Sequence, residues 1–286
     1  MRFNKVFAVF TCYIMSHSAY ALDLDFVADL DLHSIDPETG SGFDGDLDKG
    51  GSVFGKAQLI AMSDKFTFEL EGSFVGAIDD NRTETYEEQS GNLSFTTHYK
   101  FDLWNNPAGV FAGLATAKQV EKNADEYAEY ATVGFEYGFI RDRSNTVLQI
   151  GYAERLDSGG NSDIITNYGF FAATYSRDIR ENTYIELSGY VLEAAQTVQN
   201  DYGYAASASA AFNWAVSDRL ALRLGAEYWE TEEYTPGGSS TKGQYHAGFV
   251  GVRFAFGDRS VREGRNLVLF DAPNMFREQA WVGEIW

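Results

Sequence analysis

Apolar and polar residues alternate one by one along the chain from Leu22 onward. Over Leu22–Leu32 the even-numbered positions are apolar, and every odd-numbered position except Val27 is an aspartate. Successive side chains of a strand point to opposite faces, so this period of two predicts a strand with one apolar and one acidic face. The same period returns as far as Phe256, and no helical period competes with it. We predict about twelve strands (ten to fourteen), near residues 22–32, 52–62, 66–78, 92–103, 109–117, 127–140, 146–155, 163–176, 183–192, 202–214, 220–229 and 244–256.

The connections between these strands are short and long in turn. The short ones are 63–65, 105–107, 142–145, 178–182 and 217–219, and the longer ones include 34–51, 79–91, 118–126, 193–201 and 230–243. This alternation is expected of an antiparallel up-and-down barrel whose tight turns gather at one end and whose loops grow at the other. Both ends of the barrel segment then lie at the short-turn end, which requires an even number of strands.

The first residues have the features of an export signal. A positively charged start precedes the mostly apolar stretch Val6–Met15, and Ala19–Ala21 has the small-x-small form of a cleavage site. We therefore predict a signal peptide over 1–21, a barrel over 22–256 and a C-terminal periplasmic extension over 257–286. The single cysteine, Cys12, falls within the signal, so disulfide chemistry is not expected in the mature chain.

Composition and charge narrow the class further. No later stretch approaches the roughly 18 uninterrupted apolar residues of a transmembrane helix. Aromatic residues make up 15% of the chain and proline is rare, as suits a barrel wall in which nearly every N–H is paired. The formal charge of -20 argues against nucleic acid, whose phosphates require a basic surface. It allows small cations, and divalent bridges to outer-membrane lipid and lipopolysaccharide.

The closing segment carries a more specific motif, Gly251-Val252-Arg253-Phe254-Ala255-Phe256. This motif is similar to the signal that the barrel-assembly machinery reads on the last strand, a glycine followed by alternating aromatics. Over roughly 22–256, the chain resembles Gram-negative outer-membrane β-barrels of the porin-like class. The resemblance implies a transmembrane barrel in the outer membrane, recognised by that machinery through Gly251, Phe254 and Phe256. In the family the motif usually ends the chain, whereas here the extension follows it.

Charged residues on the polar faces of the predicted strands form the candidate site. We expect them to line the lumen, where an excess of carboxylates favours cations. These residues are Asp25, Asp29, Lys56, Glu69, Glu71, His98, Lys100, Asp102, Glu136, Glu186, Arg223, Glu227 and Arg253. Salt bridges among them would instead close the narrow lumen of a barrel of this size. The inward residues Phe54, Phe111, Trp229 and Phe249 would narrow it further.

The predicted function is a channel for passive diffusion of small hydrophilic solutes that prefers cations. One alternative is a closed structural or adhesive barrel with acidic surface loops. One such loop contains Asp44–Asp48, which lacks the continuation of an EF-hand and is interpreted as solvated. Another alternative is a lipid-modifying enzyme using His246 with Ser239 or Ser240, although no H-x-S pattern exists. We expect no catalysis, metal or cofactor. The extension could dock beneath the barrel, plug it, bind a partner or stay loosely ordered.

Overall fold

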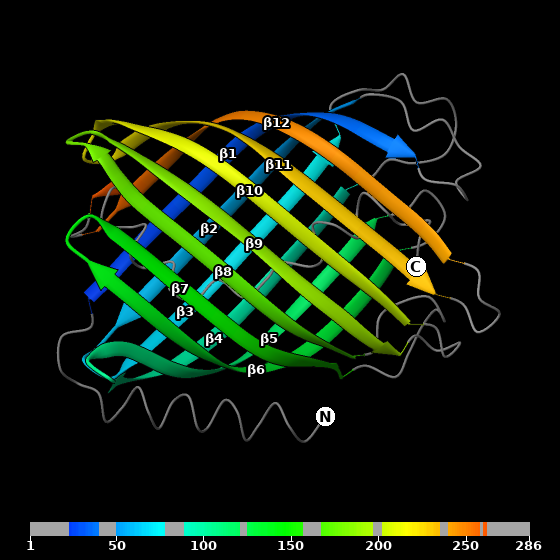
Figure 1. Ribbon diagram of the computed structural model, residues 1–286, viewed down its shortest axis with the longest axis horizontal. Coiled ribbons are helices and arrows are strands. Elements are labelled where there is room, and N and C mark those ends of the chain that lie inside the picture. Colours follow the sequence, from blue (N-terminus) through cyan, green and yellow to red (C-terminus); the bar gives the residue numbers. More distant parts are fainter. Residues whose placement is uncertain are drawn as a thin grey trace.

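The chain forms one closed antiparallel barrel of twelve strands, in which neighbours in sequence pair and β1 pairs with β12 (Figure 1). The computed structural model describes residues 23–39, 50–77, 89–120, 125–156, 167–196, 202–234, 240–257 and 260–261. The strands are β1 (Asp23–Thr39), β2 (Gly50–Met62), β3 (Phe66–Ala77), β4 (Gln89–Leu103), β5 (Asn106–Val120), β6 (Asp125–Arg141), β7 (Ser144–Arg155), β8 (Asn167–Arg180), β9 (Thr183–Gln196), β10 (Tyr202–Ser217), β11 (Leu220–Tyr234) and β12 (Ser240–Phe256). The predicted fold class is confirmed.

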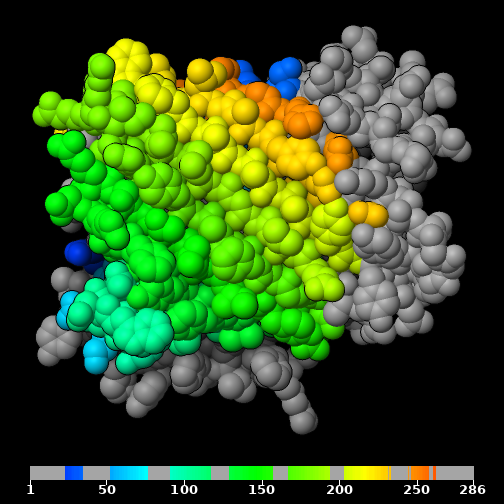
Figure 2. Space-filling model, in the orientation of Figure 1, coloured from blue at the N-terminus to red at the C-terminus, as the bar shows by residue number. Residues whose placement is uncertain are grey.

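The alternating pattern separates an outer from an inner face. Outward side chains such as Leu30, Val133 and Leu224 are 44%, 57% and 59% exposed. Inward neighbours such as Asp31 and Glu227 are buried. Figure 2 shows the outside of this wall, where the green and yellow strands β7 to β10 lie side by side. An apolar outer surface of this extent suits contact with lipid, and strands of about ten residues already cross a bilayer when tilted. Among the described residues, no helix is long and apolar enough to cross a membrane.

The strands extend further than the apolar alternation predicts. β1 continues to Thr39 instead of ending near Leu32, and β11 continues to Tyr234 instead of ending near Trp229. Their partners on β12 run alongside to the same point, as in the pairs Thr39–Gly243 and Tyr234–Ser240. Ladder hydrogen bonds join backbone groups, so pairing persists where side chains no longer have an apolar face to bury.

The five short connections lie at one end of the barrel, at 63–65, 104–105, 142–143, 181–182 and 218–219 (Figure 1, left). The predicted turn at 105–107 is shifted, because the turn residues are Trp104 and Asn105, with φ of 53° and 59°. Positive φ at both positions is typical of the two-residue hairpin turns that match strand twist. The amide of Asn106 donates to the Trp104 carbonyl oxygen at 3.2 Å and supports this turn.

The chain turns inward just after β12. Val261 is fully buried against Ala215, Ala221 and Ala255, three inward-facing residues at the short-turn end. Its N–H donates to the Asp218 carbonyl oxygen at 2.7 Å. The predicted signal peptide, the acidic loop at Asp44–Asp48 and the extension beyond Val261 lie outside the described residues, so the predictions made for them stay predictions.

Candidate functional site

The thirteen predicted lumen residues all occupy inward positions of their strands. Asp29 on β1, for example, lies opposite Arg253 of β12 on one side and Lys56 of β2 on the other. Burial alternates with the same phase, since Asp25 and Asp31 are buried whereas Leu24 and Leu32 are exposed. The structure thus places these side chains inside the barrel. That they line a conducting path stays a prediction.

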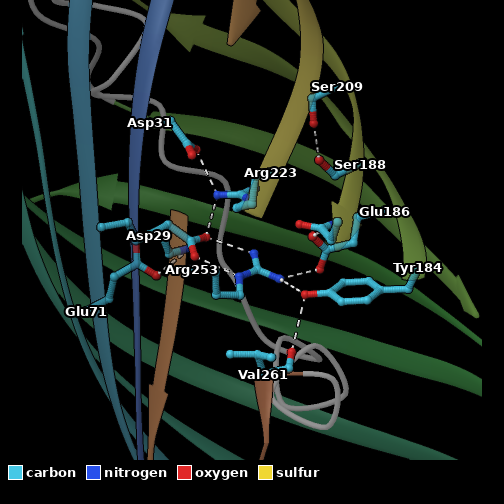
Figure 3. A network of polar contacts seen from close by, with 12 residues as sticks. Asp29, Asp31, Glu71, Tyr184, Glu186, Ser188, Ser209, Arg223, Arg253 and Val261 are labelled. Carbon is cyan, nitrogen blue, oxygen red and sulfur yellow. Dashed lines mark hydrogen bonds and ion pairs between the residues drawn. The ribbon is translucent and has the colours of Figure 1, made fainter. Parts of the chain in front are cut away.

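One polar group inside the barrel is an arginine network made of Asp29, Asp31, Glu186, Arg223 and Arg253 (Figure 3). The Arg253 guanidinium donates to both carboxylate oxygens of Asp29, at 2.7 and 2.8 Å, and to Glu186 at 2.7 Å. The Nη1 atom of Arg223 lies 2.8 Å from both Asp29 and Asp31. Two-pronged pairing of this kind is the strong form of the carboxylate–arginine contact. The network therefore joins β1, β9, β11 and β12 across the inner wall.

Gly251, which has no side chain, and the side-chain amide of Asn213 also contribute to this network. Gly251 lies between Asp31 and Arg223 in the strand register, and a Cβ atom there would overlap the Asp31 carboxylate. The missing side chain thus lets Arg223 reach across β12 to Asp31. On the other side of the network, the Asn213 amide donates to Glu186 at 3.0 Å.

Tyr184 connects the network to the segment after β12. The hydroxyl of Tyr184 lies 3.4 Å from the Nη1 atom of Arg253 and donates to the Val261 carbonyl oxygen at 3.3 Å (Figure 3). The ring is fully buried. The short-turn end of the lumen is therefore occupied by Tyr184 and Val261 next to the charged groups.

A second polar group lies on β2 and β3. Lys56 approaches Glu71 at 3.1 Å. The Gln58 amide donates to Glu69 at 2.8 Å and to Glu71 at 3.0 Å. One amide thus holds two carboxylates that are neighbours on the same face of one strand. Like charges at such spacing repel, so Lys56 and Gln58 offset part of that repulsion.

His98 lies between two carboxylates from different strands. Its Nδ1 atom is 3.3 Å from Glu136, and its Nε2 atom is 3.7 Å from Glu69. Glu136 belongs to β6 and His98 to β4, so the contact crosses over β5. It does so at Gly109, where a Cβ atom would overlap the Glu136 carboxylate. This His98 cluster (Glu69, His98, Glu136) joins three sections of the wall.

Next to His98, whose ring centroid lies 5.7 Å from that of Phe111, part of the interior is aromatic, and most of this cluster was not predicted from the sequence. Large inward side chains from β5 to β9 pack together there, and the rings of Phe111 and Phe170 are 6.3 Å apart. Both rings lie over inward glycines, Phe111 over Gly134 and Phe170 over Gly151. The buried members of this aromatic cluster are Phe111, Tyr130, Ala153, Tyr168, Phe170, Leu192 and Ala205. Of the aromatic residues in this cluster, Phe111 alone had been expected to point inward.

Four predicted residues lie outside these groups. Lys100 and Asp102 occupy inward positions close to the Trp104–Asn105 turn, where Asp102 is exposed. Asp25 is buried near the start of β1, opposite Ile60. Glu227 lies at the middle of β11, opposite Ser209 and Ala247. The structure therefore distributes the charged residues along the length of the barrel.

Several polar partners of the charged residues were not predicted from the sequence. Gln58 and Asn213 donate to carboxylates, and the Tyr184 hydroxyl accepts from Arg253; each of the three stands at an inward position of its strand. The alternation of side chains along each strand already assigned these residues to the inner face. Because they are uncharged, nothing in the sequence marked them as partners of the charged residues. The spacing role of Gly109 and Gly251 depends on neighbours far away in the sequence.

No protein-family model matches the sequence, and no curated protein matches it significantly. Among solved structures, an outer-membrane channel from Pseudomonas putida F1 is similar with a TM-score of 0.51 and 12% sequence identity, covering 83% of this chain and 97% of that chain. The chain has the fold of an outer-membrane β-barrel protein. The NanC porin (TM-score 0.45, 10% identity, covering 79% of this chain and 98% of that chain) and the translocator domain of autotransporter NalP from Neisseria meningitidis (0.43, 12%, 89% and 96%) are also similar. The exposed apolar outer wall suits contact of this barrel with membrane lipid.

Proposed function

We propose that this barrel is a narrow outer-membrane channel for small hydrophilic solutes and that it prefers cations. The observation that carries the proposal is the charge of the inner wall. The contacts described above join six carboxylates (Asp29, Asp31, Glu69, Glu71, Glu136, Glu186) to three permanent cations (Lys56, Arg223, Arg253) and His98. Carboxylates thus outnumber permanent cations within the contacting groups themselves. An excess of this sign raises the local concentration of cations.

The arrangement of the wall supports a path of limited width. Twelve strands about 4.8 Å apart and tilted by about 40° enclose a backbone cylinder of about 12 Å radius. Several large inner side chains are folded along the wall over glycines of a neighbouring strand, as Phe111 is over Gly134 and Phe249 is over Gly225. Side chains that follow the wall take less of the central cross-section than side chains that point to the axis.

A closed structural barrel is the second candidate, and the burial of the inner side chains favours it. Trp229 and Tyr130 are 1% exposed and His98 is 0% exposed, although all three point inward. A lumen of this kind would pass ions slowly or not at all. In that case the paired charges would serve to rigidify the wall.

Conductance and solute flux separate the two candidates. The purified protein is reconstituted into planar bilayers and, separately, into liposomes for swelling assays with a monosaccharide and a trisaccharide. The channel proposal expects discrete conductance steps and faster swelling with the monosaccharide than with the trisaccharide. The absence of conductance from a barrel that is folded by circular dichroism would refute it in favour of the closed barrel.

A further inference from the structure

A basic groove runs along the outer face of the barrel at its short-turn end. The groove follows β7, whose outward residues Ser144 and Thr146 form the floor. One wall comes from β6 and the other from β8, because the register places Ser144 between Arg141 and Arg177. In the same way it places Thr146 between Phe139 and Tyr175. The lining residues are Phe139, Arg141, Asp142, Arg143, Ser144, Thr146, Tyr175 and Arg177.

The charge of this groove is opposite to that of the protein. Three arginines and one aspartate line it, in a chain with 22 basic and 42 acidic residues. All three arginine side chains are exposed. Within the described part of the chain, no carboxylate forms an ion pair with Arg141, Arg143 or Arg177. Three guanidinium groups therefore converge on one groove with their donors available to a ligand.

The floor of the groove changes from polar to apolar with distance from the turn. The outward residues of β7 are, in order, Ser144, Thr146, Leu148 and Ile150, and Ile150 is 58% exposed. Phe139 and Tyr175 flank the point where hydroxyl side chains give way to aliphatic ones. The groove thus offers, in order from the turn, arginines, hydroxyl groups and aliphatic side chains. A molecule that complements it has an anionic head, a short polar section and a hydrocarbon chain.

We propose that this groove binds the headgroup of an anionic phospholipid from the periplasmic leaflet. Guanidinium groups pair with phosphate oxygens in a planar, two-pronged geometry, and the Ser144 and Thr146 hydroxyls can donate to the remaining oxygens. A glycerol headgroup adds no positive charge, whereas an ethanolamine headgroup carries an ammonium that the three arginines would repel. The acyl chain would lie along Leu148 and Ile150. The proposal rests on the outer-membrane location of the proposed function and on the orientation expected for such barrels, with the short turns on the periplasmic side.

Native mass spectrometry of the detergent-solubilised protein tests this site directly. Phosphatidylglycerol and phosphatidylcholine are titrated into the wild type, the variants Arg177→Gln and Arg141→Gln/Arg177→Gln, and a matched control, Arg180→Gln. Arg180 is exposed at the same end of β8 but does not line the groove. We expect the wild type to bind phosphatidylglycerol more tightly than phosphatidylcholine, and this affinity to fall about fivefold for each groove arginine removed. The control should bind like the wild type.

Three results would overturn the proposal. One is equal affinity of the wild type for both lipids, and another is an equal loss of affinity in the Arg180→Gln control. The third is binding of inorganic phosphate as tightly as of phosphatidylglycerol, because the aliphatic part of the groove would then contribute nothing. The groove is outside the lumen, so the groove variants should conduct like the wild type. A failed lipid site and a failed channel would therefore give different results.

Discussion

Replacing Arg253 by glutamine is expected to lower the free energy of unfolding by about 3 kcal/mol, because the buried Arg253 lies between two partly buried carboxylates. It donates to Asp29 through two hydrogen bonds and to Glu186 through a third. Breaking a buried ion pair by removing one partner typically costs about 3–5 kcal/mol. We expect the lower end of this range, since Asp29 keeps Arg223 at 2.8 Å and Glu186 keeps Asn213 at 3.0 Å.

Urea unfolding of the protein in lipid vesicles, followed by tryptophan fluorescence, measures this change. Arg180→Gln, which removes the same charge from an exposed site, should change the stability by less than about 0.5 kcal/mol. The double variant Arg253→Gln/Glu186→Gln should be more stable than the sum of the single changes by about 1 kcal/mol or more, because residues in one ion-pair network couple. Additive single changes, or an Arg253→Gln variant as stable as the control, would refute the role given to the network.

Three other predictions concern the wall. Leu70→Arg, on the outer face near the middle of β3, should lower the free energy of unfolding in vesicles by about 2–4 kcal/mol. An unchanged free energy of unfolding would mean that Leu70 does not face lipid. Gly109→Val should cost about 1–3 kcal/mol in urea unfolding, since its side chain must displace Glu136. Gly248→Val, which has free space outside, should cost less. An epitope tag at Asn105 should be hidden from antibody on intact cells, and surface labelling there would reverse the proposed orientation.

The wall of this barrel was predictable because lipid outside and polar groups inside impose one strict period. β1 is the clearest example, since aspartates alternate with apolar residues over Leu22–Leu32 with Val27 as the one exception, and its predicted faces are those of the structure. β8 is harder. Phe170 and Phe171 are adjacent, one inward and buried and the other outward and 47% exposed, so an aromatic interior hides the period.

The ion pairs between charged residues inside the lumen could not be predicted from the sequence. Arg223 and Asp31 are 192 positions apart, and only closure of β1 onto β12 brings them together across Gly251. The charged residues could be assigned to the inner face one strand at a time. Their partners depend on the register of every strand between them, which local patterning does not specify. The recognition of Gly251, Phe254 and Phe256 by the barrel-assembly machinery stays a prediction.

The cation preference of the barrel can be measured as the reversal potential of the reconstituted protein in a potassium chloride gradient. We expect a reversal potential whose sign indicates that potassium passes more readily than chloride. The preference should weaken at high salt, and also in Glu69→Gln/Glu71→Gln, which removes two inward carboxylates, including the one that lies 3.1 Å from Lys56. A reversal potential of the opposite sign in the wild type, indicating preferred chloride passage, would contradict the acidic lining on which the proposed function rests.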